Sequence, residues 1–314
     1  MQLIEYIAAR LFALGMRILP LRCASALGAA IGRLGFALDR RHAGRAVRQI
    51  AASFPGKSDA ECRALAKGAF THLGRCLAEF PHLPRMNASN VPRFIEMRGL
   101  DALRDLLARG HGAIFITGHI GFWELTGAAL AASGIPLTVI ARPIDNPRVD
   151  AFVRRVRTSG GQVVVDKLGA MRGSLRALKD GGAVGILMDQ DAGKGGLFVD
   201  FLGRPASTID APARLAMRTG AAVVSVTSYR EPATGRRVLR VGDEVEIAGA
   251  DDFGGDEEAA VVENTRRMSA ALAEAVSERP EQWLWVHRRW KTQPPGPVPG
   301  ETSQSSEGGE GDGG

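Results

Sequence analysis

His119 and Glu124 are the titratable side chains of the segment ITGHIGFWELTG, residues 116–127. The chain has only six histidines, and this one ends an apolar run, with a carboxylate five residues later. A carboxylate that accepts a hydrogen bond from one imidazole nitrogen fixes the tautomer and raises the basicity of the other. Such a pair can take a proton from an alcohol that attacks a carbonyl carbon. The alternative is a strand-end histidine bonded to backbone and a surface glutamate.

This chemistry requires a particular local structure. In the middle of a helix, residues five apart point about 140° away from each other. The two side chains can therefore meet only if His119 lies on a turn and Glu124 in the first turn of a helix. Gly118 and Gly121 allow such a bend. The sequence predicts a strand that ends near His119, a position where open parallel sheets bind ligands, and a helix over 122–132.

The rest of the chain alternates between strand and helix patterns. Apolar runs predict strands, and helical periodicity predicts helices, the first of them within residues 40–110, where Ser58 and Glu61 form a capping-box pattern. The expected strands are 113–118, 136–142, 162–166, 183–189 and 221–230, and the helices between them are 122–132, 147–160, 171–181 and 209–220. A strand pair over 237–247, an acidic loop at 251–258 and a long helix over 259–278 follow. This order predicts an α/β fold with a mostly parallel, mixed sheet flanked by helices.

The N-terminal 40 residues are apolar but are interrupted by Arg10, Arg17, Arg22 and Arg33. The uncharged stretch over 23–32 is half of the about 20 residues that a spanning helix needs. Apolar helices with regular arginines can lie in the membrane interface, and we expect a membrane-associating helical segment over 1–40. A buried helical hairpin and a true membrane span are the alternatives.

The amino-acid composition limits the classes of binding partner. The net charge of +6 suits an anionic partner such as a phospholipid surface or an acidic carrier protein. Only 6% of residues are aromatic, which argues against a nucleic-acid platform. The three cysteines have no zinc or disulfide spacing, so we expect a reducing compartment and no metal. No phosphate-binding glycine motif and no GxSxG nucleophile motif is present.

Three sequence segments downstream of residue 127 make the pattern more specific than the His119–Glu124 pair alone. They are ARPIDNPRVDAFVRR, ILMDQDAGKGGLFVDFLGRPASTIDAPARLAMRTGA and PEQWLWVHRRWK. With the first segment they resemble the lysophospholipid acyltransferase superfamily, specifically the late lauroyl/myristoyl transferases of lipid A biosynthesis, over residues 1–292. The resemblance implies helices around a mixed sheet, an HxxxxE catalytic pair, acyl-carrier protein as the usual donor, and residence at the cytoplasmic face of the inner membrane.

The resemblance also assigns residues. It implies that His119 is the general base and Glu124 its orienting partner. For substrate it implies a phosphate-binding Arg142 with Asn146, cleft groups at Asp189 and Gln190, and an acyl-chain wall that includes Gly196, Phe198 and Phe201. A surface arginine, an ordinary turn and simple core packing are the respective alternatives. WLWVHRRW is either an interfacial aromatic belt or a basic segment near the site. Phe122 departs from the Asn that many relatives carry there, which leaves the acceptor open.

We therefore expect a membrane-associated O-acyltransferase over 41–292, followed by a disordered tail over 293–314. It would move a fatty acyl chain from an acyl thioester to a hydroxyl of a lipid A precursor or related glycolipid. Acyl-carrier protein is the expected donor and coenzyme A thioester the alternative, with no other cofactor. Competing hypotheses are an acyltransferase for another glycolipid or phospholipid, a thioesterase that uses the same base on water, and a catalytically silent membrane-surface binding protein.

Overall fold

A seven-stranded sheet forms the centre of the molecule in a computed structural model that describes residues 2–166 and 169–295. The strand order is β1-β9-β8-β2-β5-β3-β4, and β8, β2, β5, β3 and β4 run parallel. Strand β9 is antiparallel to β8 and parallel to β1. Their bounds are β1 Glu96–Arg98, β2 Ala113–Thr117, β3 Leu137–Ala141, β4 Val163–Asp166, β5 Ala183–Leu187, β8 Ala222–Arg230 and β9 Arg237–Glu244. The predicted mostly parallel, mixed sheet is confirmed.

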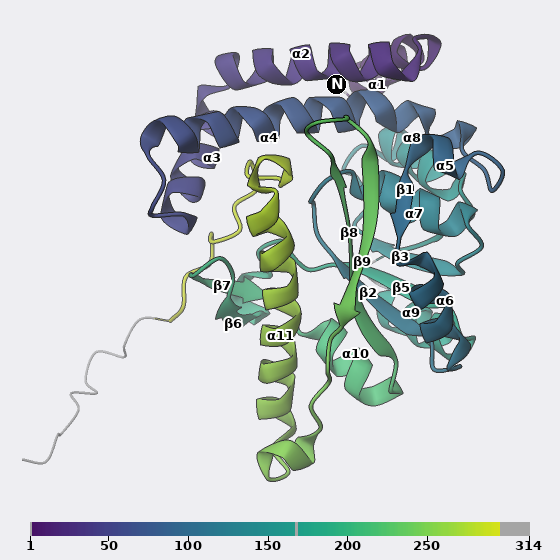
Figure 1. The fold of residues 1–314 in the computed structure, drawn as a ribbon, viewed down its shortest axis with the longest axis vertical. Coiled ribbons are helices and arrows are strands. Elements are labelled where there is room, and N and C mark those ends of the chain that lie inside the picture. The colour runs from purple at the N-terminus through teal and green to yellow at the C-terminus, as the bar shows by residue number, and fades with distance from the viewer. Residues whose placement is uncertain (1, 167–168, 296–314) are drawn as a thin grey trace, which may run out of the picture.

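Helices cover both faces of this sheet (Figure 1). Side chains of β2 alternate between the two layers, because successive strand residues point to opposite faces: Phe115 belongs to one core and Ile114 and Ile116 to the other. The helices on the Phe115 side are α6 Leu100–Ala108, α7 Trp123–Ala132 and α8 Pro147–Thr158. Those on the other side are α9 Ala170–Lys179, α10 Ala211–Thr219 and α11 Glu257–Glu278.

The N-terminal helices form a separate layer above one end of the sheet (Figure 1). They are α1 Gln2–Ile18, α2 Leu21–Leu38, α3 Arg40–Ser53 and α4 Asp59–Glu79. The predicted capping box at Ser58 and Glu61 begins α4. Glycines let α2 and α4 approach closely: a Cβ on Gly32 would lie 2.1 Å from the carbonyl oxygen of Phe70, and one on Gly74 would lie 2.2 Å from that of Gly28.

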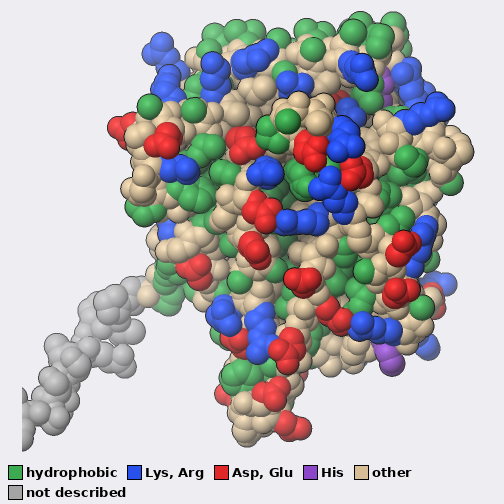
Figure 2. All heavy atoms as spheres, viewed as in Figure 1, with side chains coloured by type: hydrophobic (Ala, Val, Ile, Leu, Met, Phe, Trp, Pro, Cys, Tyr) green, Lys and Arg blue, Asp and Glu red, His purple; other side chains and the backbone are tan. Residues whose placement is uncertain are grey.

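The outer faces of α1 and α2 are apolar and exposed. Seven large apolar side chains of α1 and four of α2 are open to solvent: Leu3, Ile4, Ile7, Leu11, Phe12, Leu14, Ile18, Leu27, Ile31, Leu34 and Leu38. Figure 2 shows these apolar atoms interspersed with Lys and Arg along the edge that the two helices form. By length and composition, α2 is the one helix of the described chain able to cross a membrane, with a third of its residues buried.

Several short elements differ from the sequence-based expectation. Strand β1 lies in a region expected to be helical, and β6 Leu197–Asp200 pairs with β7 Pro205–Thr208 in a small antiparallel hairpin that was not expected. Residues 237–247 contain one strand, β9 Arg237–Glu244, instead of a strand pair. The long helix α11 starts at Glu257, so it takes in the end of the expected acidic loop. Residues 296–314 of the expected tail lie outside the described residues.

Candidate active site

His119 lies in the loop between β2 and α7, at the carboxyl edge of the parallel strands. Gly121 gives this loop its bend, with φ of 58°, and a Cβ there would lie 1.7 Å from the carbonyl oxygen of Ser228. Both features exclude a larger residue. The loop is held from outside by residues near the C-terminus, since Gly121 N donates to Gln282 O at 3.0 Å and Leu284 N to His119 O at 3.1 Å. The predicted turn between strand and helix is thus present.

Asp189 is the carboxylate that holds the His119 imidazole. It follows β5 by two residues, and its Oδ1 lies 2.9 Å from His119 Nδ1. Its Oδ2 accepts from the backbone N of His119 at 2.6 Å and from Trp283 Nε1 at 2.7 Å. Gly118 makes room for this carboxylate, because a Cβ there would lie 2.8 Å from Asp189 Oδ2. The side chain of Asp189 is 2% exposed and that of His119 is 16% exposed.

The hydrogen bonds fix which nitrogen of His119 is free. Burial alone would raise the pKa of Asp189, but the charge of His119 and the hydrogen bonds from His119 and Trp283 outweigh it and hold that pKa below its ordinary value. An ionised carboxylate is only an acceptor, so Nδ1 of His119 must carry the proton that Asp189 binds. The lone pair of Nε2 is then available, and Gln190 Nε2 lies 3.4 Å from this atom. His119 is arranged as a base.

Glu124 has a different partner from the one that the sequence suggested. It lies in the first turn of α7, as expected, but its Oε1 is 2.5 Å from Arg157 Nη2 of α8 and 3.3 Å from Trp123 Nε1. Among the hydrogen bonds of the described residues, none joins Glu124 to His119. Burial works to lower the pKa of Arg157, but the hydrogen bonds and charge of Glu124 raise it. Glu124 thus anchors α7 to α8.

A cavity of about 380 Å³ opens beside His119, between the sheet and α7 and α8. This size falls within the range of about 300–1,000 Å³ for small-molecule sites. His119, Glu124, Arg142 and Gln190 line it near the strand ends, so the structure brings these four predicted residues together. Arg142 is 84% exposed, and 3.7 Å separates its Nη2 from Asp145 Oδ1. The walls also include the apolar residues Phe115, Leu130, Leu137, Val139, Leu187 and Val226.

The remaining predicted substrate residues do not line this cavity. Asn146 caps the N-terminus of α8 and donates to Gln2 O at 2.7 Å, so it ties α8 to α1. Phe201 is buried against Trp283 and Trp290. Gly196 packs closely on the hairpin, where a Cβ would lie 2.3 Å from Ser207 Oγ, and Phe198 lies on β6 of the same hairpin. These positions support the core-packing alternative for residues 196–202.

The C-terminal segment 280–291 packs against the segments that carry the site residues. Its tryptophans Trp283, Trp285 and Trp290 are buried, so the hypothesis of an interfacial aromatic belt is wrong. Arg289 is fully buried and donates to the carbonyl of Gln190 at 2.8 Å and to Thr208 Oγ1 at 2.5 Å. Burial lowers the pKa of Arg289 to about 10, which leaves it charged at neutral pH. The alternative hypothesis, a basic segment near the site, agrees with these contacts.

Sequence reasoning missed the positioning roles of Arg157, Trp283 and Arg289. A basic residue in the last turn of a predicted helix and a Trp-rich segment were visible signals, but neither names its partner. Trp283 is 94 residues from Asp189 along the chain. Only the fold brings such groups together.

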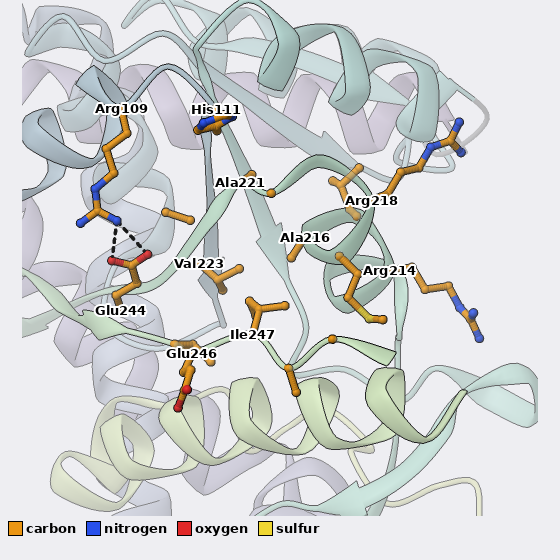
Figure 3. Close-up of a pocket in the computed structure, with 18 of the residues that line it drawn as sticks. Arg109, His111, Arg214, Ala216, Arg218, Ala221, Val223, Glu244, Glu246 and Ile247 are labelled. Atoms are coloured by element: carbon orange, nitrogen blue, oxygen red, sulfur yellow. Dashed lines mark hydrogen bonds and ion pairs between the residues drawn. The ribbon is translucent and has the colours of Figure 1, made fainter. Parts of the chain in front are cut away.

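A second hollow lies at the opposite edge of the sheet (Figure 3). It has a volume of about 1210 Å³ and includes residues that precede β2 and β8. Figure 3 shows Arg109 bonded to Glu244 at its side, with the apolar side chains of Val223 and Ile247 facing it. Within residues 2–166 and 169–295, no cluster of His, Cys, Asp or Glu suited to a metal ion is present. Because His119, Glu124, Arg142 and Gln190 line the His119 cavity, that cavity is the candidate active site.

Comparison with known proteins gives a consistent result. The sequence model of the bacterial lipid A biosynthesis acyltransferases matches residues 3–292. The chain is 28% identical over 272 residues to a lipid A biosynthesis palmitoleoyltransferase of Escherichia coli K12, covering 86% of this chain and 85% of the relative. It is 28% identical over 274 residues to the lauroyltransferase of the same organism, covering 86% of each. A phosphatidylinositol mannoside acyltransferase of Mycobacterium tuberculosis (strain CDC 1551 / Oshkosh) is 27% identical over 223 residues, covering 69% of this chain and 67% of the relative.

Proposed function

Since this chain belongs to the bacterial lipid A biosynthesis acyltransferase family and is an acyltransferase, we propose that it moves a fatty acyl chain from an acyl thioester to a hydroxyl of a lipid A precursor or related glycolipid. The observation that carries the reaction type is the His119–Asp189 pair, which leaves Nε2 of His119 free beside an apolar cavity. This arrangement supplies a base and a place for a hydrocarbon chain.

The chemistry proceeds by direct attack. Nε2 of His119 accepts the proton of the acceptor hydroxyl while its oxygen bonds to the thioester carbonyl carbon. Asp189 stabilises the imidazolium that forms, because its carboxylate already accepts the Nδ1 hydrogen at 2.9 Å. The tetrahedral intermediate then expels the thiolate, which takes the proton back from His119. An ester and a thiol result, and no acyl-enzyme is needed.

The donor we propose is acyl-carrier protein. The chain carries a net charge of +6, which suits an acidic protein more than a small coenzyme, since long-range attraction guides charged proteins together. Arg142 lies at the cavity and is 84% exposed, so its guanidinium can leave its exposed ion pair with Asp145 to bind a phosphate of the donor or of the acceptor.

We place the protein at the cytoplasmic face of the inner membrane. The support is the exposed apolar face of α1 and α2, flanked by arginines. The buried side of α2 packs on α4 through glycines, so this helix can lie on the bilayer surface and remain part of the folded domain.

The test is acyl transfer measured by mass spectrometry. Purified protein receives acyl-carrier protein or coenzyme A thioesters together with a lipid A precursor, and both the acylated lipid and the free fatty acid are quantified. His119→Ala should lower transfer by about 10²–10⁴-fold, because it removes the base.

The matched control is His111→Ala, an exposed histidine outside the cavity, which should keep wild-type activity. Free fatty acid as the sole product would favour the thioesterase hypothesis. Retention of more than about a tenth of wild-type transfer by His119→Ala would refute the base assignment.

A further inference from the structure

The polar side chain of Gln162, in the segment that leads into β4, lines the inner end of the His119 cavity. It is 5% exposed, and its Oε1 atom is buried with no hydrogen-bond partner among the described residues. Leu130, Leu137 and Val139 line the same inner part. Buried polar atoms are nearly always paired, so an unpaired amide oxygen at the end of an apolar cavity requires an explanation.

Two glycines widen the same cavity. Gly185 stands in the middle of the central strand β5, where glycine weakens a strand and often marks the close approach of a ligand. A Cβ there would meet Val139 Cγ1 at 3.3 Å, a tight contact that a small shift of the Val139 side chain would relieve. Gly127 lies inside α7, and a Cβ there would lie 2.5 Å from Gln162 Oε1. Gly185 thus leaves room along the channel, and Gly127 makes room for the Gln162 amide at its end.

The length of this channel follows from the strand register. Leu187 pairs with Thr117 at the His119 end, and Ala183 pairs with Leu137 at the inner end. These levels are four residues apart, or about 13 Å along the strands. A chain whose carbonyl carbon lies beside Nε2 of His119 would run past Gly185 and end before Gln162.

We propose that Gln162 and Gly185 set the length of the acyl chain that this enzyme accepts, and that the chain is straight and unsubstituted. The inference rests on the proposed acyl transfer. Each methylene that enters the apolar part of the cavity improves binding by about fourfold. A chain that reaches Gln162 covers the amide NH₂ group, which is not fully buried and forms no hydrogen bond with the described residues, and this weakens binding on the order of tenfold. The kcat/KM for the acyl donor should therefore rise with chain length until the chain reaches Gln162 and fall for longer chains.

The experiment compares straight-chain acyl-carrier thioesters that lengthen by two carbons at a time, with kcat/KM measured for each. Gln162→Leu replaces the amide with an apolar group of similar size, so the first chain that is too long for wild type should gain on the order of tenfold relative to the preferred chain. Gly185→Ala adds a methyl group halfway along the channel, so the preferred chain should become shorter.

Two variants outside the cavity serve as matched controls. Gly56→Ala, in an open turn, and Gln293→Leu, on an exposed residue, should keep the wild-type length profile. Melting temperatures check that all four variants fold. An unchanged profile in both Gln162→Leu and Gly185→Ala would overturn the inference, as would a wild-type preference for chains hydroxylated near their far end.

A second readout separates this inference from the proposed reaction. The rise in melting temperature caused by free fatty acids of the same lengths reports the cavity without any transfer. If no protein transfers an acyl group but the length profile of binding moves with Gln162→Leu and Gly185→Ala, the proposed reaction fails and the length inference stands. If transfer occurs and both profiles stay fixed, the length inference alone fails.

Discussion

Two carboxylates stand near the His119 loop, and their hydrogen bonds separate their roles. Asp189 accepts directly from Nδ1 and from the backbone N of His119, whereas Glu124 forms an ion pair with Arg157. Asp189 is almost completely buried, and its three donors are all fixed by the surrounding fold. Asp189 is therefore suited to orient the base, and Glu124 to hold α7 and α8 in the geometry that forms the cavity wall.

This division predicts unequal effects of two conservative changes. Asp189→Asn removes the charge that stabilises the imidazolium and turns an amide NH₂ toward at least one donor, so kcat should fall by about 10²–10⁴-fold. Glu124→Gln keeps a hydrogen-bond acceptor for Arg157, so its loss should stay within about tenfold. Steady-state rates of acyl transfer measure both.

Asp180→Asn, on the surface after α9, is the matched control and should leave kcat unchanged. A greater loss for Glu124→Gln than for Asp189→Asn would contradict the assignment of Asp189 as the partner of the base.

The sequence predicted only some of these features of individual residues. It predicted that His119, Asp189 and Gln190 lie at the ends of strands, because apolar runs stop just before each of them. It did not predict that Asp189 binds His119, since the two are 70 residues apart and their pairing depends on strand order. Because Glu124 is only five residues after His119, the sequence suggested Glu124 as the partner of His119 instead of Asp189.

The helix α4 supports the His119 loop through a buried pair of side chains. Cys76 Sγ lies 3.4 Å from His72 Nε2 and 3.6 Å from the carbonyl oxygen of Gly121. Burial lowers the pKa of His72 from an ordinary 6.5 to about 4, with smaller contributions from nearby arginines, against the opposing effects of the Gly121 carbonyl and Glu79. A neutral His72 is thus part of the folded contact between α4 and the loop.

The lowered pKa predicts a loss of stability in weak acid. Between pH 6.5 and about 4 the unfolded chain binds a proton at His72 that the folded chain excludes, so acidification favours unfolding. From about pH 7 to about pH 5 this group should remove about 2 kcal/mol from the free energy of unfolding. His72→Gln should lose correspondingly less over the same interval.

Urea titrations in detergent at the two pH values measure this difference. His82 and His287, whose pKa values burial also lowers, are present in both proteins, so their contribution cancels in the comparison. Equal acid sensitivity of wild type and His72→Gln would show that His72 is protonated in the folded state.

Elements with a strong periodic pattern were predictable, and short ones were not. The predicted helix over 147–160 and the strand over 221–230 match α8 and β8 closely, because caps and glycines bound them. Strand β1 has only three residues, too few to show alternation. The strands of the hairpin β6–β7 pair with each other beside α11, whereas for this segment the family resemblance had implied only an acyl-chain wall.

Across the whole molecule, the apolar face of α1 and α2 lies toward the carboxyl ends of the parallel strands, where the His119 cavity opens. Strand β9 runs away from these helices in Figure 1, so β8 and the strands parallel to it point toward them. Their carboxyl ends carry His119 and Asp189. Helix α1 also touches α8 through Asn146, four residues after Arg142 at the cavity. A bilayer under α1 would thus lie next to the cavity.

This placement predicts that a variant that binds vesicles poorly also transfers little acyl chain to an acceptor embedded in them. Leu11→Asp/Leu14→Asp places two charges on the exposed face of α1, where each leucine would contribute about 1.5–3 kcal/mol on insertion. The variant should float poorly with anionic vesicles and transfer little to acceptor embedded in them. In detergent micelles, where acceptor diffuses freely, its transfer rate should approach that of wild type.

Salt would separate the two forces that we propose to hold the protein at a membrane surface. Each arginine near an anionic bilayer contributes about 1 kcal/mol that salt screens, whereas apolar insertion is insensitive to salt. Wild-type flotation should therefore weaken in high salt without disappearing, and the double variant should lose its remaining flotation. Val262→Asp changes an exposed apolar residue on α11, away from α1 and α2, and should behave as wild type. If Leu11→Asp/Leu14→Asp floats as well as wild type, the membrane contact lies on another part of the surface. If this variant is also inactive in detergent micelles, the substitutions have damaged the site itself.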